Sequence, residues 1–233
     1  MVLDSSSLVS ILVPTFNEGK ALGDLARRLC VAMPNAEVWV IDAGEDGAKA
    51  RVENFPGFHY RKQEPRRGKG AAIRMGVEQA TRPILAQIDS DLQFYPEDLP
   101  ALISPILAGE VDMVCGSRLM PTSVRHERSI PGARLIGNRA VSAYASLLSL
   151  HGFTDILAGI KAWRREVTAS FSQDADDFCY EAELPIKAIR HGWRVGDVPV
   201  RTDPRRFGRS SVDVVRTGWA LLRNIPGYRW GNP

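Results

Sequence analysis

Short apolar runs alternate with stretches of helical spacing along the first half of the chain. Five of these runs have the length and composition of β-strands, at residues 8–14, 37–42, 58–62, 84–89 and 111–117. Between them, apolar residues recur every three or four positions, as in amphipathic helices, over 18–33, 68–80 and 96–109. This alternation predicts an α/β fold with a mostly parallel central sheet and helices on both faces.

The second half of the chain has longer helical patterns and fewer strands. Helices are predicted at 133–150 and 177–192, and strands within 155–166 and at 193–201. The loop 202–211 follows the last strand. Because the sequence contains no linker, repeat or low-complexity segment, residues 1–233 are predicted to form a single domain.

Composition adds a charge asymmetry to this pattern. The 233 residues are 44% hydrophobic and 24% charged, which is ordinary for a globular protein. The net charge is only +3, yet the part from Arg201 to the end holds seven arginines and two acidic residues. A basic end suits an anionic partner such as a phosphate or a lipid headgroup, whereas the small total gives no reason to expect nucleic acid.

The sequence shows no targeting signal and no membrane span. No apolar stretch reaches the roughly 18 residues that a transmembrane helix needs. The N-terminal residues "MVLDSSSLVS" lack the basic start and apolar run of a signal peptide. Three widely spaced cysteines, Cys30, Cys115 and Cys179, are typical of reduced thiols. We therefore expect a cytoplasmic protein.

Two aspartates stand at the end of the strand predicted at 84–89. Asp89 and Asp91 are two positions apart, so in an extended chain they would share one face, and Gln93 follows two residues later. Neighbouring carboxylates repel each other unless a cation or a proton lies between them. Either the pair holds a hard cation such as Mg²⁺ or Mn²⁺, or the strand has ended and the pair faces water.

Several stretches together resemble the family 2 glycosyltransferases of the GT-A fold, and among them the polyprenol-phosphate mannosyl- and glucosyltransferases. They occur in the order typical of that family and span nearly the whole chain: "VPTFNE" (13–18), "RRGKGAAIRMG" (66–76), "DSDLQFYPEDL" (89–99), "GSR" (116–118), "TDILAGIKAWRRE" (154–166), "YEAELPIKAIRHGWRVGDVPV" (180–200) and "RRFGRSS" (205–211). The resemblance implies an inverting, metal-dependent transfer of mannose or glucose from a GDP- or UDP-sugar to a polyprenyl or dolichyl monophosphate.

The same resemblance assigns roles to parts of the chain. It implies a nucleotide-sugar-binding half at 1–118, an acceptor-binding half at 119–211 and a basic amphipathic segment at 212–233. The donor would lie on Pro14, Phe16, Glu18, Asp42, Lys69 and Asp89. A Mg²⁺ or Mn²⁺ ion would be held by Asp89, Asp91 and Gln93. The acceptor phosphate would bind Arg118, Arg134, Arg206 and Arg209, with Asp89, Asp91 and Arg118 as the catalytic residues.

No convincing general base stands out in the sequence. Glu181 and Glu183 are candidates, but residues two apart on a helix do not share a face. An acceptor phosphate is already anionic, so it could attack without a strong base.

Other interpretations of these residues remain open. Asn17 could simply cap a helix, and the arginines could form a solvated basic loop. The sequence departs from the family at Ala43 and Glu45, where an aspartate and a serine are usual, and at Ser211, where a lysine is usual. The departures at Ala43 and Glu45 bear on the recognition of the base or ribose, whereas Ser211 favours, as an alternative, a soluble small-molecule acceptor. A non-catalytic nucleotide-sugar-binding subunit and a nucleotidyltransferase are further alternatives.

The C-terminal segment has a polar and an apolar side. On a helical wheel, the apolar residues of 212–225 occupy one half and the charged residues the other. Such a helix more often packs on its own domain, which is our first expectation. With Trp219 among its apolar residues and flanking arginines, it also resembles an interfacial helix, so a peripheral contact with the cytoplasmic membrane face is the second.

Overall fold

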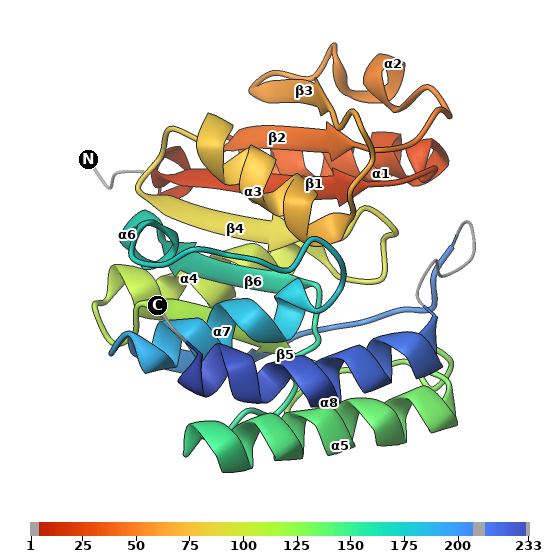
Figure 1. Ribbon diagram of the computed structural model, residues 1–233. Coiled ribbons are helices and arrows are strands. Elements are labelled where there is room, and N and C mark those ends of the chain that lie inside the picture. The colour runs from red at the N-terminus through yellow and green to blue at the C-terminus, as the bar shows by residue number, and fades with distance from the viewer. Residues whose placement is uncertain (1–4, 207–212, 232–233) are drawn as a thin grey trace.

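A seven-stranded sheet runs through the centre of the molecule (Figure 1). The computed structural model describes residues 5–206 and 213–231 of the chain. The strands are β1 (Val9–Thr15), β2 (Glu37–Asp42), β3 (Phe58–Lys62), β4 (Ile84–Ile88), β5 (Met113–Ser117), β6 (Ile160–Arg164) and β7 (Val195–Pro199). Their order in the sheet is β3-β2-β1-β4-β6-β5-β7. Strands from both halves of the chain therefore build the same sheet.

One strand runs against the others. β6 pairs antiparallel with both β4 and β5, whereas the remaining pairs of neighbours are parallel. The predicted mostly parallel sheet is therefore confirmed. Because β6 is reversed, the residues that precede it lie at the same edge of the sheet as the residues that follow β1, β4 and β5. That edge is where ligands bind in sheets of this kind.

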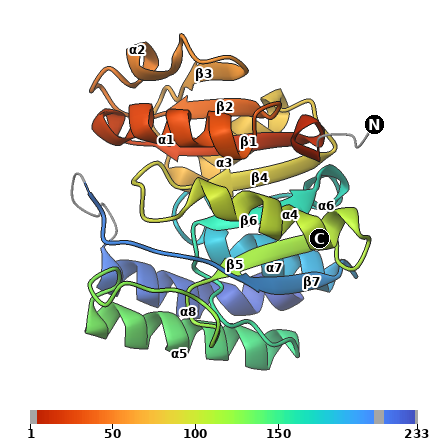
Figure 2. The same ribbon diagram turned by 180° about the vertical axis from the view of Figure 1, so that it is seen from behind.

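Helices cover both faces of the sheet. They are α1 (Gly19–Ala32), α2 (Ala48–Val52), α3 (Lys69–Gln79), α4 (Leu99–Leu107), α5 (Gly132–Ser149), α6 (Arg165–Ala169), α7 (Tyr180–Arg190) and α8 (Val214–Trp230), with short 3-10 turns η1 (Ser5–Leu8) and η2 (Pro96–Asp98). In Figure 1, α3, α7 and α8 lie in front of the sheet, and Figure 2, seen from behind, shows α1 and α4 on the opposite face.

Alternate residues of the strands face two separate cores. Ile11 of β1 packs in the core beneath α1 and α4, and its neighbour Leu12 packs in the core beneath α3 and α7. This is the two-residue period of a strand that is buried on both faces. It explains why the strands could be found in the sequence as continuous apolar runs.

The helices differ from the prediction in three places. α2 and α6 were not predicted, because each has only five residues and offers little periodicity. The helical wheel of the C-terminal segment covered only residues 212–225, whereas α8 continues through Pro226 to Trp230. In the part of the chain that the structure describes, no helix combines the length and apolar character needed to cross a membrane.

The segment after β7 returns to the loop after β4. Thr202 forms isolated bridges with Phe94 and with Arg125, and the Asp203 amide donates to the Gln93 carbonyl at 3.0 Å. These contacts bring residues near position 205 beside the aspartates at position 89 and 91. Two segments that are more than a hundred residues apart in sequence thus meet at the edge of the sheet.

Candidate active site

A cavity of about 850 Å³ opens at the carboxyl edge of the sheet. Its lining comes from the segment after β1, the start of α3, the loop after β4, the segment after β7 and the first turn of α8. Six of the residues predicted to bind the donor or the metal line it: Pro14, Phe16, Glu18, Lys69, Asp89 and Asp91.

The side chains of Asp89 and Asp91 are largely buried rather than solvated. The Asp91 side chain is 3% exposed and that of Asp89 is 27% exposed. The Asp89 amide donates to the Gly159 carbonyl at 3.2 Å, and Asp91 accepts from the Gln93 amide at 3.0 Å. A solvated strand end would show neither this burial nor these contacts.

Burial also perturbs both carboxyl groups. It raises the pKa of Asp89, and the charges of Asp91 and Glu181 add to this, whereas Lys69 opposes it. Burial likewise raises the pKa of Asp91 against the charge of Arg205. Two carboxyls that are costly to ionise together bind a cation readily, because the cation removes that cost.

A cation of the protein already contacts each aspartate. Lys69 Nζ forms an ion pair with Asp89 and a second one with Glu181 at 2.5 Å. Arg205 pairs with Asp91 at 2.8 Å and with Glu18. We call these two groups the lysine cluster (Lys69, Asp89, Glu181 and Lys161) and the arginine cluster (Arg205, Asp91 and Glu18).

The oxygen ligands suit Mg²⁺ or Mn²⁺. Within the described residues, no group of three His, Cys, Asp or Glu side chains is placed to hold a metal ion. The protein would thus supply two carboxylates and leave the other positions to substrate phosphate and water, as is common for Mg²⁺. Gly159 makes room for this, because a Cβ atom there would lie 2.0 Å from Asp89 Oδ2.

Gln93 is turned away from the cavity. Its side-chain nitrogen donates to the Ser129 carbonyl at 3.1 Å, and it is not among the lining residues. Its backbone joins the loop after β4 to Asp203 and to Asp91. The structure therefore does not bring Gln93 to the two aspartates as a third metal ligand.

Glu181 is held by cations on both sides. Lys161 and Lys69 form ion pairs with its carboxylate, and Gln87 Nε2 donates to it at 3.1 Å. Although burial raises its pKa, the charges of the two lysines outweigh burial and hold that pKa below the ordinary value. A carboxylate with a lowered pKa and cations as partners is a poor proton acceptor.

Glu183 is occupied as well. It accepts from the backbone amides of Asp174 at 2.7 Å and Ala175 at 2.9 Å, and it forms an ion pair with Lys187 at 2.7 Å. Neither glutamate is available as a general base. This agrees with the prediction that the sequence contains no convincing one.

The segment after β1 forms the opposite wall of the cavity. The guanidinium of Arg66 lies over the Phe16 ring at 3.6 Å, and the Ser90 hydroxyl donates to the Pro14 carbonyl at 3.2 Å. The Ser90 hydroxyl also donates to Glu18, whose pKa is raised by burial. Arg66 was not predicted as a site residue, although it begins one of the quoted stretches.

Asp42 and Asn17 have structural partners. Asp42 accepts from the Gly44 amide at 2.7 Å and from the Tyr60 hydroxyl at 2.9 Å. It lies behind the cavity, which its neighbour Ala43 lines. The interpretation of Asn17 as a helix cap is wrong, because Glu18 occupies that position and Asn17 accepts from the Glu45 amide at 3.1 Å.

Arg205 lines the cavity beside the acidic pair, whereas the predicted acceptor residues Arg118 and Arg134 are not among the lining residues. Arg118 forms a two-pronged ion pair with Asp155, at 2.6 Å and 2.8 Å. Burial, followed by the charges of Arg118 and Arg205, lowers the pKa of Arg134. The charges of Arg118 and Arg205 thus act unfavourably on Arg134, and an anion bound near them would relieve this repulsion.

Arg206 was predicted to bind the acceptor phosphate, but its neighbour Arg205 is the residue that faces the cavity. Arg206 is exposed, whereas Arg205 reaches Glu18 and Asp91. Arg209 lies outside the described residues. The sequence offered one signal for Arg205, which is its place at the start of the quoted stretch "RRFGRSS".

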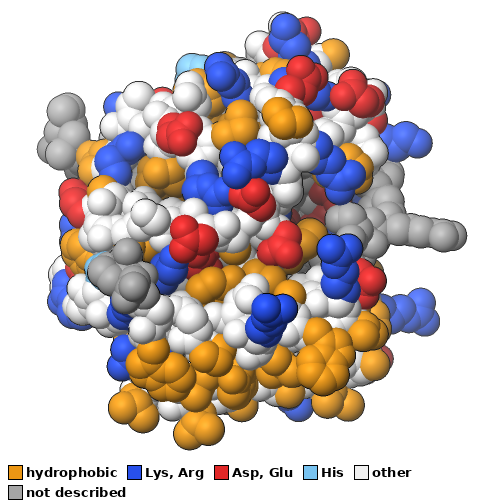
Figure 3. All heavy atoms as spheres, viewed as in Figure 1, with side chains coloured by type: hydrophobic (Ala, Val, Ile, Leu, Met, Phe, Trp, Pro, Cys, Tyr) orange, Lys and Arg blue, Asp and Glu red, His pale blue; other side chains and the backbone are white. Residues whose placement is uncertain are grey.

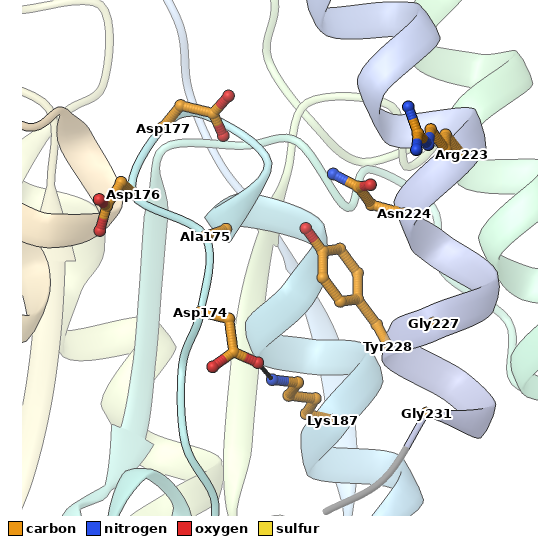
Figure 4. A pocket seen from close by; sticks show the side chains of 10 residues that line it. All are labelled: Asp174, Ala175, Asp176, Asp177, Lys187, Arg223, Asn224, Gly227, Tyr228 and Gly231. Atoms are coloured by element: carbon orange, nitrogen blue, oxygen red, sulfur yellow. Dashed lines mark hydrogen bonds and ion pairs between the residues drawn. The ribbon is translucent and has the colours of Figure 1, made fainter.

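A second cavity, of about 620 Å³, lies between the loop 174–177 and α8 (Figure 4). The Asp174 carboxylate is bound to Lys187 at 2.6 Å, whereas the Asp176 side chain points away from α8 and pairs with Arg67 and Arg74. None of the predicted site residues lines it. We therefore assign the candidate active site to the cavity that contains the acidic pair.

Comparison with known proteins points to one family. Residues 10–168 match the family model described as glycosyl transferase family 2. The chain is 30% identical over 214 residues to the polyprenol monophosphomannose synthase of Mycolicibacterium smegmatis, covering 87% of this chain and 80% of that protein. It is 29% identical over 235 residues to the undecaprenyl-phosphate mannosyltransferase of Micrococcus luteus, covering 96% and 93%.

Solved structures show the same fold. Glucosyl-3-phosphoglycerate synthase from Mycobacterium tuberculosis, crystallised with Mn²⁺, UDP and glucosyl-3-phosphoglycerate, has a TM-score of 0.75 and 21% identity to this chain. The match covers 99% of this chain and 84% of that one. The predicted GT-A fold is therefore confirmed.

Proposed function

Because the chain belongs to glycosyl transferase family 2, we propose that it transfers a hexose, mannose or glucose, from a GDP- or UDP-sugar to a polyprenyl monophosphate. The observation that carries this proposal is the separation of charge at the edge of the sheet. The carboxylates Asp89 and Asp91 lie beside Arg205, and the charges of Arg118 and Arg134 interact with this pair. One side suits a cation with a diphosphate, and the other suits a phosphate monoester.

The donor would occupy the wall formed by Pro14, Phe16 and Glu18. Asp89 and Asp91 would hold Mg²⁺ or Mn²⁺, which when bound neutralises charge on the leaving diphosphate. Lys69 stands beside Asp89 and can donate to a diphosphate oxygen as a point charge. Glu181 would keep Lys69 in place rather than take part in proton transfer.

The acceptor phosphate would lie against the arginines. Guanidinium groups bind phosphate oxygens through paired hydrogen bonds, and Arg118 is held for this by Asp155. A phosphate oxygen then attacks the anomeric carbon while the bond from that carbon to the diphosphate breaks, which inverts the configuration. Since the acceptor is already ionised at neutral pH, the step needs no general base, in keeping with the occupied glutamates.

A lipid acceptor is favoured over a soluble one by the relatives. Proteins named for polyprenol and undecaprenyl phosphate cover 87% and 96% of this chain. The arginines recognise the phosphate and not the chain attached to it, however, so a soluble phosphorylated acceptor is the candidate to test against.

The test is a matrix of donors and acceptors. GDP-mannose, UDP-glucose and UDP-N-acetylglucosamine are each incubated with Mn²⁺ and with polyprenyl phosphate, with 3-phosphoglycerate or without acceptor, and released nucleotide and glycosylated product are measured. We expect product with polyprenyl phosphate and one hexose donor. Product with 3-phosphoglycerate alone would support the soluble-acceptor alternative. Donor binding without any product would indicate a non-catalytic subunit.

A further inference from the structure

We infer that the exposed apolar face formed by α5 and α8 docks on a membrane surface that contains anionic lipid. The inference deepens the proposed function and rests on it in one respect, the lipid nature of the acceptor. It is carried by the exposure, the spacing, the charge and the position of the side chains on these two helices.

Each helix exposes a stripe of large apolar side chains. On α8, Val215 is 72% exposed, Trp219 72%, Leu222 43% and Trp230 61%. These residues are separated by multiples of about one helical turn, so they lie on one side of the helix. The opposite side of α8 packs on the protein through the buried Leu221, Ile225 and Tyr228. The expectation that this helix packs on its own domain therefore holds for one side of α8, and the other side stays exposed.

The outer side of α5 has the same character. Ile136 is 71% exposed, Leu147 70% and Leu150 87%, and the exposed Ala140 and Ala143 lie between them. The five positions are spaced by three or four residues and form a continuous stripe. Nothing in the core requires apolar residues there, because the helix packs inward through Val141 and Ala145.

The two stripes belong to one surface. The Tyr144 hydroxyl of α5 donates to the Leu222 carbonyl of α8 at 3.5 Å, and both views of the ribbon show the helices side by side (Figures 1 and 2). In Figure 3, apolar side chains gather over the region where these helices lie. Exposed apolar surface of this extent marks an interaction site.

The charge of the two helices favours a lipid surface. Neither α5 nor α8 contains an aspartate or glutamate, whereas together they carry five arginines, of which Arg139, Arg216 and Arg223 are exposed. Anionic headgroups attract such a basic surface. A two-fold contact with a second copy would bring the face against itself and oppose arginine with arginine. The observations thus favour a membrane over a dimer.

The face begins at the mouth of the candidate active site. Arg216 and Thr217 in the first turns of α8 line the cavity, and Val215 and Trp219, their neighbours in the chain, are exposed on the outside. A lipid phosphate could enter the cavity while its hydrocarbon chain stays in the bilayer. Exposed tryptophans at both ends of α8 suit the boundary between headgroups and hydrocarbon.

Vesicle flotation without donor or acceptor tests the inference. The protein is mixed with phosphatidylcholine–phosphatidylglycerol vesicles or with pure phosphatidylcholine vesicles, and the floating fraction is measured. We expect flotation with the anionic vesicles, weakened by salt. The double variant Leu147→Glu/Trp219→Glu should lose at least about tenfold in vesicle affinity, since two large apolar side chains no longer enter the interface.

The matched control is Val31→Glu on α1. Val31 is 82% exposed, and α1 lies on the other face of the sheet (Figure 2). This variant adds an acidic charge at an exposed apolar position away from the α5–α8 face and should float like the wild type. If the double variant melts early, Leu150→Asn/Trp230→Ser makes the same test at two other exposed positions. Asparagine tolerates the positive φ of Leu150.

A second measurement separates this inference from the proposed function. Sugar transfer to a short-chain polyprenyl phosphate in solution, without vesicles, should be equal in the wild type and the double variant. A wild type that transfers sugar but does not float would overturn the docking surface and leave the function standing. A wild type that floats but does not transfer sugar would overturn the proposed function and leave the docking surface standing. A dimer that dissociates in the double variant, with no flotation, would assign the face to a second copy and overturn the inference.

Discussion

The lysine cluster and the arginine cluster stand side by side at the edge of the sheet, yet different parts of the fold hold them. Lys69, Glu181 and Lys161 belong to α3, α7 and β6, and their side chains are 9% exposed or less. Arg205 lies in the segment after β7, and its side chain is 24% exposed. The regular framework thus fixes one cluster, and a loop supplies the cation of the other.

The different supports of the two clusters imply different roles for their charges: some stabilise the fold, and others can be replaced by a bound cation. A buried ion pair between rigid elements cannot lose one partner without leaving the other uncompensated. A cation on a loop can leave a carboxylate when another cation arrives. We therefore expect changes at Glu181 and Lys161 of the lysine cluster to affect the stability of the fold, and changes in the arginine cluster to affect the binding of metal and acceptor.

The largest effect is expected for Glu181→Gln. Removing this charge leaves Lys161 buried beside a neutral amide, and losing one partner of a buried pair typically costs about 3–5 kcal/mol of unfolding free energy. Denaturant unfolding measures the change. Glu45→Gln, at a highly exposed carboxylate, is the control and should unfold like the wild type. A Glu181→Gln variant of unchanged stability would contradict the structural role of the lysine cluster.

The same variant should change the response to acid. The pKa of Glu181 is lowered in the folded protein, so its stabilisation is complete above its unfolded pKa and is lost as pH falls through the folded pKa. Between neutral and acidic pH, the unfolding free energy of Glu181→Gln should therefore fall less steeply than that of the wild type. An equally steep fall would assign the acid sensitivity to other carboxyl groups.

A somewhat smaller effect is expected for Asp91→Asn in the arginine cluster. Losing an oxygen ligand should lower turnover by more than about a hundredfold, since even outer-shell partners of a metal are worth roughly ten- to a hundredfold. Donor affinity should fall too, and the fold should survive because a buried charge is removed. Initial rates against Mn²⁺ concentration test this. Activity that resists chelators would remove the metal from the proposal.

Arg205→Ala should weaken the binding of the acceptor and leave the binding of the donor unchanged. The loss of a charge-assisted hydrogen bond costs ~1.5–3 kcal/mol, which raises the acceptor KM roughly ten- to a hundredfold. Arg205→Lys should recover part of the loss, because an ammonium group cannot form the paired contact. Initial rates against polyprenyl phosphate concentration measure the acceptor KM, and calorimetric titration measures the donor affinity.

Arg206→Ala is the matched control for this experiment. Arg206 is the next residue in the chain and is exposed, so its loss should leave the acceptor KM unchanged. If Arg206→Ala and not Arg205→Ala raised the KM, the acceptor would bind on the outer side of this loop.

The smallest effect is expected for Ala43→Asp, away from both clusters. Ala43 lines the cavity at the end of β2, where its amide donates to the Thr15 carbonyl at 3.0 Å. One added hydrogen bond, worth ~1 kcal/mol, should shift the preference between guanine and uracil donors about fivefold. Competition between GDP-mannose and UDP-glucose measures the shift. Loss of turnover with every donor would mean that this loop does not border the base.

The position of the acidic pair could be predicted because it depends on local pattern. A buried apolar run marks β4, and polar residues after a parallel strand lie where ligands bind. Lys69 followed from the resemblance of the stretch "RRGKGAAIRMG" to the family, and the strands followed from continuous apolar runs. In each case the neighbours in the chain carried the signal.

The partners of these residues could not be predicted, because they come from distant segments. Whether Arg205 or Arg206 faces inward depends on the bridges of Thr202 with Phe94 and Arg125, and the local sequence does not contain that register. Glu181 was a candidate base until Lys69 and Lys161 were seen on either side of it. The outer stripe of α5 is visible in the sequence, but its place beside α8 is not.

The joining of the Thr202 segment to the loop after β4 has a consequence for how the protein folds. The contacts of Arg205 with Glu18 and Asp91 close loops that span about half of the chain or more, and long-range contacts of this kind form late. During synthesis, the strands up to β4 emerge long before the segment after β7 does. Until that segment arrives, the two carboxylates lack their cation, so a growing chain holds an acidic pocket that only its last quarter can neutralise.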